Sequence, residues 1–294
     1  MYYRRKILLA LLQTFGGTLS KFDLQKYLFL FNQEKSEPYY EFIPYMYGCY
    51  SFQSNQDLST LTKYKMVEGT EFQWSIVDKT NYINQLKTGD KILLAKLYSK
   101  YSNLKGDALI KYVYENYPYY AINSKKAKGL LSNDQYETVL SCKPRTSDYT
   151  LFTIGYEGKT VESFTNQLIK QNIKILCDVR KNPLSMKYGF SKNQLKHIVE
   201  NVGIKYIHIP ELGIESNKRQ ELNSLEAYEK LFADYEENTL PNKIAELKIL
   251  YELFLQNKRI ALTCFEADYH SCHRSRVAKA LEALFDKEYT VKHI

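Results

Sequence analysis

The side chains best suited to chemistry are concentrated in one stretch near the end of the chain, "RIALTCFEADYHSCHRSRVAKALEALF", Arg259–Phe285. It places Cys264, Glu266, Cys272, His273 and Arg274 between an apolar run and an amphipathic one. Thiols and imidazoles bind metals or act as nucleophile and base, a carboxylate transfers protons, and a helix start with cations binds phosphate. The stretch therefore admits several chemistries, and spacing has to choose among them.

A metal site is disfavoured by the spacing, which fits none of the common zinc patterns and has no second ligand pair nearby. We therefore expect neither a metal nor another cofactor. A cysteine nucleophile needs a cation or a helix start beside it, and Cys272 has both. However, Arg274 and Arg276 follow it by two and four residues, unlike the Cys-x5-Arg loop of phosphatases and related sulfur-transfer enzymes. We favour an anion held at a helix start by His273 and Arg274, with Glu266 as a carboxylate facing the same cavity.

Similar polar sequence follows the other apolar strands of this half. The run "YTLFTIGY" ends at Gly155 and Tyr156, and "IKILCDVR" ends at Asp178 and Arg180 before a loop rich in lysine and aromatic residues. Cations that hold phosphate, interleaved with aromatic faces that stack on bases, are typical of nucleotide binding. Asp178 is open to two interpretations, a structural pair with Arg180 or Arg274 and a direct contact with substrate.

The predicted site comprises catalytic and substrate-binding groups drawn from these strand ends. The predicted catalytic residues are Asp178, Glu266 and His273, and the predicted substrate-binding residues are Gly155, Tyr156, Arg180, Lys187, Phe190, Cys264, Cys272 and Arg274.

The elements that must position these groups alternate in the second half. Apolar strands at 149–156, 173–180, 204–212 and 259–266 are separated by amphipathic helices at 160–172 and 191–203 and by a long helical stretch at 224–256. Strands that alternate with helices predict a mostly parallel sheet covered on both faces. Ligands of such sheets bind beyond the carboxyl ends of the strands, where the candidate groups lie.

The first half reads as helices at 4–16 and 19–34 and a third helix before 67, followed by a short hairpin at 67–78, an order typical of winged helices. Two more helices are expected at 83–102 and 106–118. We predict a mainly helical, winged-helix-like domain over 1–142, a linker over 143–150 and a three-layer α/β domain over 151–294.

Composition narrows the class of protein. The 294 residues carry a net charge of +8, with 20 Lys and Arg against 14 Asp and Glu in residues 1–148, so nucleic acid or an acidic protein is a compatible partner of the first half. Five scattered cysteines without a CxxC pair indicate a reducing compartment. No segment reads as a membrane span or a cleaved signal peptide. We therefore expect a cytoplasmic protein without a membrane partner.

The first half resembles the Panacea domain, a helical module found with toxin–antitoxin systems. The resemblance rests on "DLQKYLFLFNQ", "FIPYMYGCYS" and "LIKYVYENYPYYAINS", covers about residues 3–125, and has Cys49 where proline is usual. It implies binding of a protein or nucleic acid rather than catalysis.

The second half resembles the domain-of-unknown-function family numbered 488, on "TIGYEGKTVESFTNQL", "ILCDVRKNPLSMKYGFSK", "YIHIPELGI" and "ALTCFEADYHSCHRSRVAKAL". The likeness covers about residues 149–285 and departs at Tyr269, near a usual proline. The family pattern falls on Asp178, Arg180, Lys187, Phe190, Cys264, Glu266, Cys272, His273 and Arg274. The resemblance supports the pocket and leaves the reaction unspecified.

Three functions follow as hypotheses. The first is an enzyme that acts on a nucleotide or nucleic acid, on an N-glycosidic bond or a base, in a bacterial defence or toxin–antitoxin setting. The second is a nucleotide-sensing or DNA- or protein-binding regulator without catalysis. The third is a cysteine-dependent redox or sulfur-transfer enzyme using Cys264 or Cys272.

Overall fold

The chain folds as two compact units, residues 1–143 and 144–294, which are described separately. The structure is a computed structural model, and it describes residues 1–215, 224–285 and 289–294. Within these residues, no helix has both the length and the apolar composition needed to cross a membrane.

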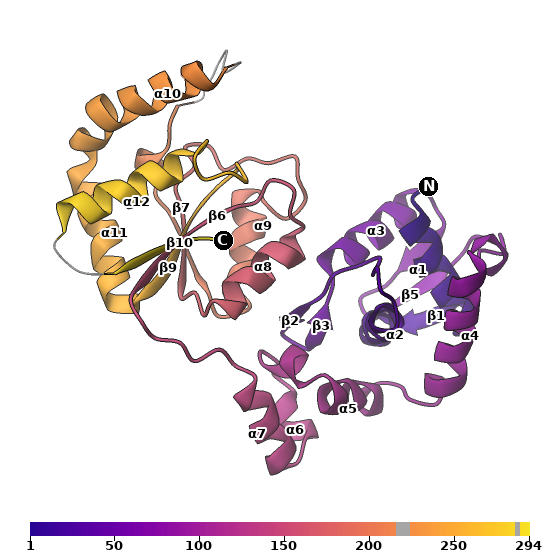
Figure 1. The fold of residues 1–294 in the computed structure, drawn as a ribbon. Helices are drawn as coiled ribbons and strands as arrows, with labels where there is room; N and C mark the ends of the chain where they lie inside the picture. The colour runs from indigo at the N-terminus through magenta and orange to yellow at the C-terminus, as the bar shows by residue number, and fades with distance from the viewer. Residues whose placement is uncertain (216–223, 286–288) are drawn as a thin grey trace. The chain divides into compact units, whose positions relative to one another are not determined.

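The first unit contains the helix–strand–helix–helix–hairpin order of a winged helix (Figure 1). Its elements are α1 (Tyr3–Thr14), β1 (Thr18–Ser20), α2 (Lys21–Gln33), α3 (Phe52–Lys63), β4 (Val67–Gly69) and β5 (Gln73–Ile76). The strands form one antiparallel sheet in the order β1-β5-β4. The hairpin expected at 67–78 is therefore confirmed, and β1 joins it as a third strand that the sequence pattern did not reveal.

Further elements surround this core. They are the strand pair β2 (Ile43–Tyr45) and β3 (Gly48–Tyr50) and the helices α4 (Thr88–Tyr101), α5 (Asp107–Asn116), α6 (Ala127–Leu130) and α7 (Asn133–Ser141). The helices at α4 and α5 were expected, whereas α6, α7 and the strand pair were not. The short length of α6 and of both strands explains why no periodic pattern marks them.

Helix α2 shows how the sequence sets the core of this unit. The hydroxyl of Ser20 caps the helix by accepting a hydrogen bond from the backbone N–H of Asp23 at 3.0 Å. The expected apolar stripe of Leu24, Tyr27, Leu28 and Phe31 is buried, and so is Lys26 on another face. The helix is therefore enclosed on all sides by the rest of the unit.

The second unit is a five-stranded sheet in which all neighbouring strands are parallel, as expected. The strands are β6 (Thr150–Gly155), β7 (Ile175–Asp178), β8 (Lys205–His208), β9 (Arg259–Cys264) and β10 (Thr290–His293), in the order β10-β6-β9-β7-β8. Strand β10 was not anticipated, because four residues with only one apolar side chain among them give no strand pattern.

Helices cover both faces of this sheet. Figure 1 shows α8 (Val161–Lys170) and α9 (Lys192–Glu200) on one face, and α10 (Leu225–Asp234), α11 (Ile244–Asn257) and α12 (His273–Leu284) on the other. The helical stretch expected at 224–256 is interrupted by a π-helical turn at Tyr235–Thr239 and a 3-10 turn containing Pro241. Leu250, Phe254, Val277 and Leu281 from α11 and α12 form one core with inward residues of the strands.

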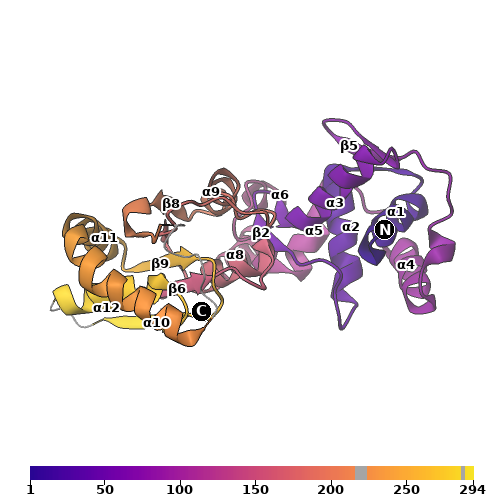
Figure 2. The same ribbon diagram turned by 90° about the horizontal axis from the view of Figure 1, so that it is seen from above.

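Strand β9 occupies the position that matters for a ligand. It lies between β6 and β7, whose following helices cover one face, while α12, which follows β9, covers the other (Figures 1 and 2). Chain segments leave these neighbouring strands in opposite directions and open a crevice at their carboxyl ends, the usual ligand position in open parallel sheets. Gly155, Asp178 and Cys264 end these three strands.

Candidate functional site

The ends of β6 and β9 approach each other closely at Gly155. Gly155 is the register partner of Cys264, and a Cβ built on Gly155 would lie 1.8 Å from the carbonyl oxygen of Glu266. The backbone N–H groups of Tyr156 and Glu157 both donate to the carbonyl of Phe265, at 3.1 and 2.8 Å. Glycine is required because any side chain at 155 would displace the loop that carries Glu266.

Three reactive side chains meet at the end of β9. The thiol of Cys264 donates to Oε2 of Glu266 at 3.1 Å, and its Sγ lies 3.6 Å from Nδ1 of His273. Nε2 of His273 lies 2.9 Å from the carbonyl oxygen of Val179, which can only accept, so Nε2 carries a proton. In a neutral ring Nδ1 then has its lone pair directed at Cys264. Two of the three predicted catalytic residues, Glu266 and His273, therefore share one contact atom.

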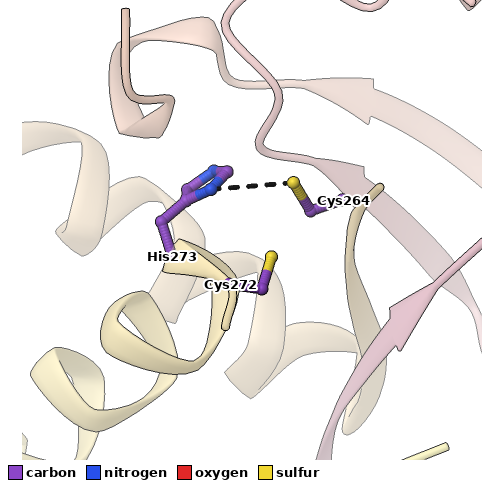
Figure 3. Close-up of side chains that lie close together, drawn as sticks. All are labelled: Cys264, Cys272 and His273. Atoms are coloured by element: carbon purple, nitrogen blue, oxygen red, sulfur yellow. Dashed lines mark hydrogen bonds between the residues drawn. The ribbon is translucent and has the colours of Figure 1, made fainter. Parts of the chain in front are cut away.

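Cys272 completes a cluster with these residues, since its Sγ, the Cys264 Sγ and a His273 ring nitrogen lie within 4.8 Å of one another (Figure 3). Cys272 is the N-cap of α12 and His273 is its first residue. Burial, followed by the neighbouring Cys264 and Glu266, raises the pKa of the Cys272 thiol well above its ordinary value. Two thiols and an imidazole are suitable ligands for a thiophilic metal ion.

Arg274 lies one residue further along α12 and is 1% exposed. Its guanidinium donates to the carbonyl oxygens of Glu266 at 2.6 Å and Ala267 at 3.1 Å. These contacts fasten the loop after β9 to the start of α12. The expected helix start at His273 is confirmed. We predicted that Arg274 would clamp a phosphate, whereas in the structure its guanidinium binds the backbone of this loop.

Asp178 and Arg180 form a buried ion pair at the end of β7. Nε and Nη2 of Arg180 donate to the two Asp178 oxygens at 2.8 and 2.5 Å, and the hydroxyl of Tyr206 donates to the same carboxylate at 2.5 Å. Burial acts to lower the pKa of the Arg180 guanidinium, but the Asp178 carboxylate outweighs it and raises that pKa. Asp178 is 0% exposed, so of the two interpretations the geometry favours the structural pair.

The predicted aromatic groups pack on one another. The rings of Tyr156 and Phe190 are stacked with centroids 4.3 Å apart, and Arg180 donates to the Tyr156 hydroxyl at 3.0 Å and to the Phe190 carbonyl at 2.9 Å. Lys187 donates to the Tyr156 carbonyl at 3.0 Å, and burial lowers the pKa of its ammonium group. Phe190 and Lys187 thus shape the loop after β7, and the buried Phe190 ring presents no open face.

A pocket of 330 Å³ opens at this edge of the sheet. It is lined by Tyr156, Arg180, Lys181, Asn182, Leu184, Ser185, Met186, Ile214, Cys264, Phe265 and His273. Four predicted residues, Tyr156, Arg180, Cys264 and His273, thus come together around one space. The other predicted residues are not part of its lining, namely Glu266, Cys272, Asp178, Arg274, Gly155, Lys187 and Phe190.

The sequence reasoning missed several lining residues. Phe265 is 43% exposed and adds a second aromatic ring to the lining beside the predicted Tyr156. Its place at the carboxyl end of the strand predicted at 259–266 was the available signal. Lys181 and Asn182 follow Arg180 and add a cation and an amide, whereas Ile214 arrives from a later loop that only the tertiary structure places here.

Comparison with protein-family models gives a match in the second half. Residues 160–281 match the family model described as "Domain of unknown function DUF488", a range that contains Asp178, Arg180 and the Cys264–Arg274 segment. No curated protein matches the chain. The family match lies in the second half and lends no support to the Panacea resemblance of residues 3–125, which stays a prediction.

Proposed function

We propose that residues 144–294 form an enzyme that hydrolyses or transfers a group of a phosphate-bearing substrate, a nucleotide or a nucleic acid. The observation that supports it best is the shared contact of Glu266 and His273 with Cys264 at the carboxyl end of β9, where Cys264 and His273 line the pocket. A carboxylate and an imidazole so close together at a ligand position are suited to proton transfer.

The pocket lining supports the substrate class. Lys181 and Asn182 offer a charged and a neutral donor for phosphate oxygens, and the half-exposed ring of Phe265 offers a face for a base. Arg180, whose charge is balanced by Asp178, lines the same wall. The first unit, with its winged-helix order, is proposed to bind the nucleic acid or protein partner.

The geometry supports a catalytic role for Glu266 and His273 better than for Asp178. Cleavage of an N-glycosidic bond by two carboxylates requires a second available carboxylate. Both Asp178 oxygens already accept hydrogen bonds from Arg180 and Tyr206. The proposal therefore assigns proton transfer to Glu266 and His273, and it assigns to Asp178 the positioning of Arg180.

The test is the release of free base, sugar or phosphate from a panel of nucleotides and oligonucleotides. Replacing Glu266 with Gln keeps the shape of the side chain but removes the proton acceptor, so kcat should fall about 100- to 10,000-fold. Glu200→Gln, on the exposed end of α9, is the matched control and should leave kcat unchanged. Unchanged kcat in Glu266→Gln would contradict the assignment. Ligand-dependent thermal stabilisation without turnover would favour the regulator.

A thiol-dependent enzyme is the second candidate, favoured by the contact between Cys264 Sγ and His273 Nδ1. If Cys264 is the nucleophile, Cys264→Ser abolishes activity while Cys272→Ser leaves most of it, since Cys272 does not line the pocket. The neighbouring Glu266 carboxylate disfavours a thiolate at Cys264, which is why this candidate ranks second. The defence or toxin–antitoxin setting stays a prediction.

A further inference from the structure

We propose that Cys264, Cys272 and His273 bind a zinc ion whose fourth position faces the pocket. Among the described residues, these three form the group of His, Cys, Asp and Glu side chains with ligand atoms within 4.8 Å of one another. Figure 3 shows the side chains converging from the end of β9 and the start of α12. The inference goes beyond the proposed function, because metal binding can occur whether or not the pocket turns over a substrate.

The observed distances suit tetrahedral coordination. Zinc bonds of about 2.3 Å to sulfur and about 2.0–2.1 Å to nitrogen at a tetrahedral angle place the two ligand atoms about 3.6 Å apart. Cys264 Sγ and His273 Nδ1 are 3.6 Å apart. Two thiolates on one zinc are about 3.8 Å apart by the same geometry, and the sulfur atoms lie within 4.8 Å. Small side-chain rotations therefore suffice to close the site.

The surroundings of His273 are those of a metal ligand. Its Nε2 donates to the carbonyl of Val179 at 2.9 Å, which fixes the ring and leaves Nδ1 to bind the ion. Histidine ligands in metal sites almost always donate their other ring N–H to such an acceptor. Val179 follows strand β7, whereas the three proposed ligands lie at the end of β9 and the start of α12, so the His273 ring is oriented by a residue outside the ligand cluster.

The charge balance favours a cation here. Two buried cysteines and the half-buried Glu266 lie close together, and the nearby Arg274 directs its guanidinium to the carbonyl oxygens of Glu266 and Ala267. As anions, these three side chains would repel one another at such short range. A divalent ion allows both thiols to bind as thiolates and removes this conflict.

The chemistry that the ion supplies rests on the proposed function. Cys264 and His273 line the pocket whereas Cys272 does not, so a water molecule can take the fourth position on the pocket side. That water gives a proton to Glu266, its oxygen bonds to the electrophilic atom of the substrate, and the proton passes to the departing group. One water is consumed, one bond of the substrate is broken, and nothing is oxidised or reduced.

The experiment titrates metal-stripped, reduced full-length protein with Co²⁺ and then Zn²⁺. We expect one equivalent of Co²⁺ with the intense visible bands of a tetrahedral site and a thiolate-to-cobalt charge-transfer band, both lost when Zn²⁺ displaces it. Cys264→Ser and Cys272→Ser should each weaken binding more than about 100-fold, the upper end of what loss of a group that merely orients a ligand costs. Cys142→Ser, a half-buried cysteine of the first unit, is the matched control and should bind like the wild type.

A second measurement needs no variant and so does not depend on how the variants fold. Zn²⁺ should protect Cys264 and Cys272 of the wild-type protein from alkylation in mild denaturant and leave Cys142 as reactive as before. Absence of stoichiometric binding, or equal protection of all cysteines, would overturn the metal site. Metal binding without turnover would support the zinc site and count against the proposed function. Turnover in protein that binds no metal would support the proposed function and count against the zinc site.

Discussion

At the scale of single residues, Asp178 shows how a reactive side chain can serve the structure. It ends β7, is fully buried, and accepts hydrogen bonds from Arg180 and Tyr206. A carboxylate that is paired in this way stabilises the fold only while both partners remain, because the surviving buried charge loses its counter-charge. Its contribution to activity therefore passes through the position of Arg180.

Replacing Asp178 with Asn should lower the free energy of unfolding by about 3–5 kcal/mol, the usual cost of breaking a buried ion pair. Urea unfolding of both proteins measures this change. The alternative is that Asp178 acts directly on the substrate. In that case the Asp178→Asn protein should keep nearly all of its stability, and its kcat per folded molecule should fall by a larger factor than its KM changes. Glu200→Gln serves again as the exposed-carboxylate control.

At the scale of elements, the site depends on how closely β6 approaches the loop after β9. An added methyl group at Gly155 would meet the carbonyl carbon of Glu266 at 2.6 Å as well as its oxygen. The backbone cannot yield without breaking the hydrogen bonds from Tyr156 and Glu157 to Phe265. Gly155 is thus a positioning residue for Glu266 and Phe265.

Gly155→Ala should destabilise the protein by about 1–3 kcal/mol through overpacking and should lower turnover by displacing Glu266. The control is Gly89→Ala in helix α4, where no atom lies within 4 Å of the added group. This change should be neutral or stabilising by up to about 1 kcal/mol. Equal thermal stability of the two variants would show that the close approach of Gly155 to the Glu266 carbonyl does not affect the free energy of unfolding.

Helix α4 of the first unit is anchored by Asp90 in its first turn. The carboxylate accepts hydrogen bonds from Tyr3 at 2.8 Å, Lys35 at 2.7 Å and Tyr39 at 2.7 Å. Burial acts to raise the pKa of Asp90, but these three donors outweigh it and lower that pKa. A carboxyl group whose pKa is lower in the folded state stabilises the fold above its unfolded-state pKa and loses this effect as the pH falls through the folded-state value.

Asp90→Asn should therefore cost about 2 kcal/mol at pH 7, a typical value for hydrogen bonds to a charged group. The difference from the wild type should shrink as the pH falls below about 4, the ordinary pKa of an aspartate. Urea unfolding at pH 7, 4 and 3 measures it. Asp107→Asn, whose carboxylate pairs with Lys126 at the surface, should cost little at any pH. A pH-independent difference at Asp90 would contradict the assignment.

At the scale of the whole molecule, each of the two units has its own set of packed elements, with helices and small sheets in the first and one parallel sheet in the second. All residues of the pocket and of the proposed zinc site belong to residues 144–294. A unit with its own core is expected to fold independently.

Residues 144–294 produced alone should unfold in a single cooperative transition and bind Co²⁺ with the affinity of the full chain. Thermal unfolding followed by circular dichroism, together with the metal titration, measures both. A fragment that is unfolded at 25 °C would show that the first unit is required for the stability of the second. Loss of nucleic-acid binding in the same fragment would locate that binding in the first unit.

The sequence by itself determined the alternation of strands and helices in the second half, the parallel sheet, and the edge at which the site lies. These features follow from local apolar periodicity and from the rule that parallel strands end on one side. It also indicated that α12 begins at His273, after a strand expected at 259–266 that in the structure ends at Cys264.

The tertiary structure alone decided which of the neighbouring groups contact one another. Arg274 binds backbone carbonyls, Asp178 pairs with Arg180, and Cys264 meets both Cys272 and His273. Linear spacing counts residues along a loop and cannot measure the distance that the loop closes, so it did not reveal that two thiols and an imidazole lie together. Side-chain partners depend on the direction and depth at which each segment leaves the sheet, and these are set by packing between elements far apart in the chain.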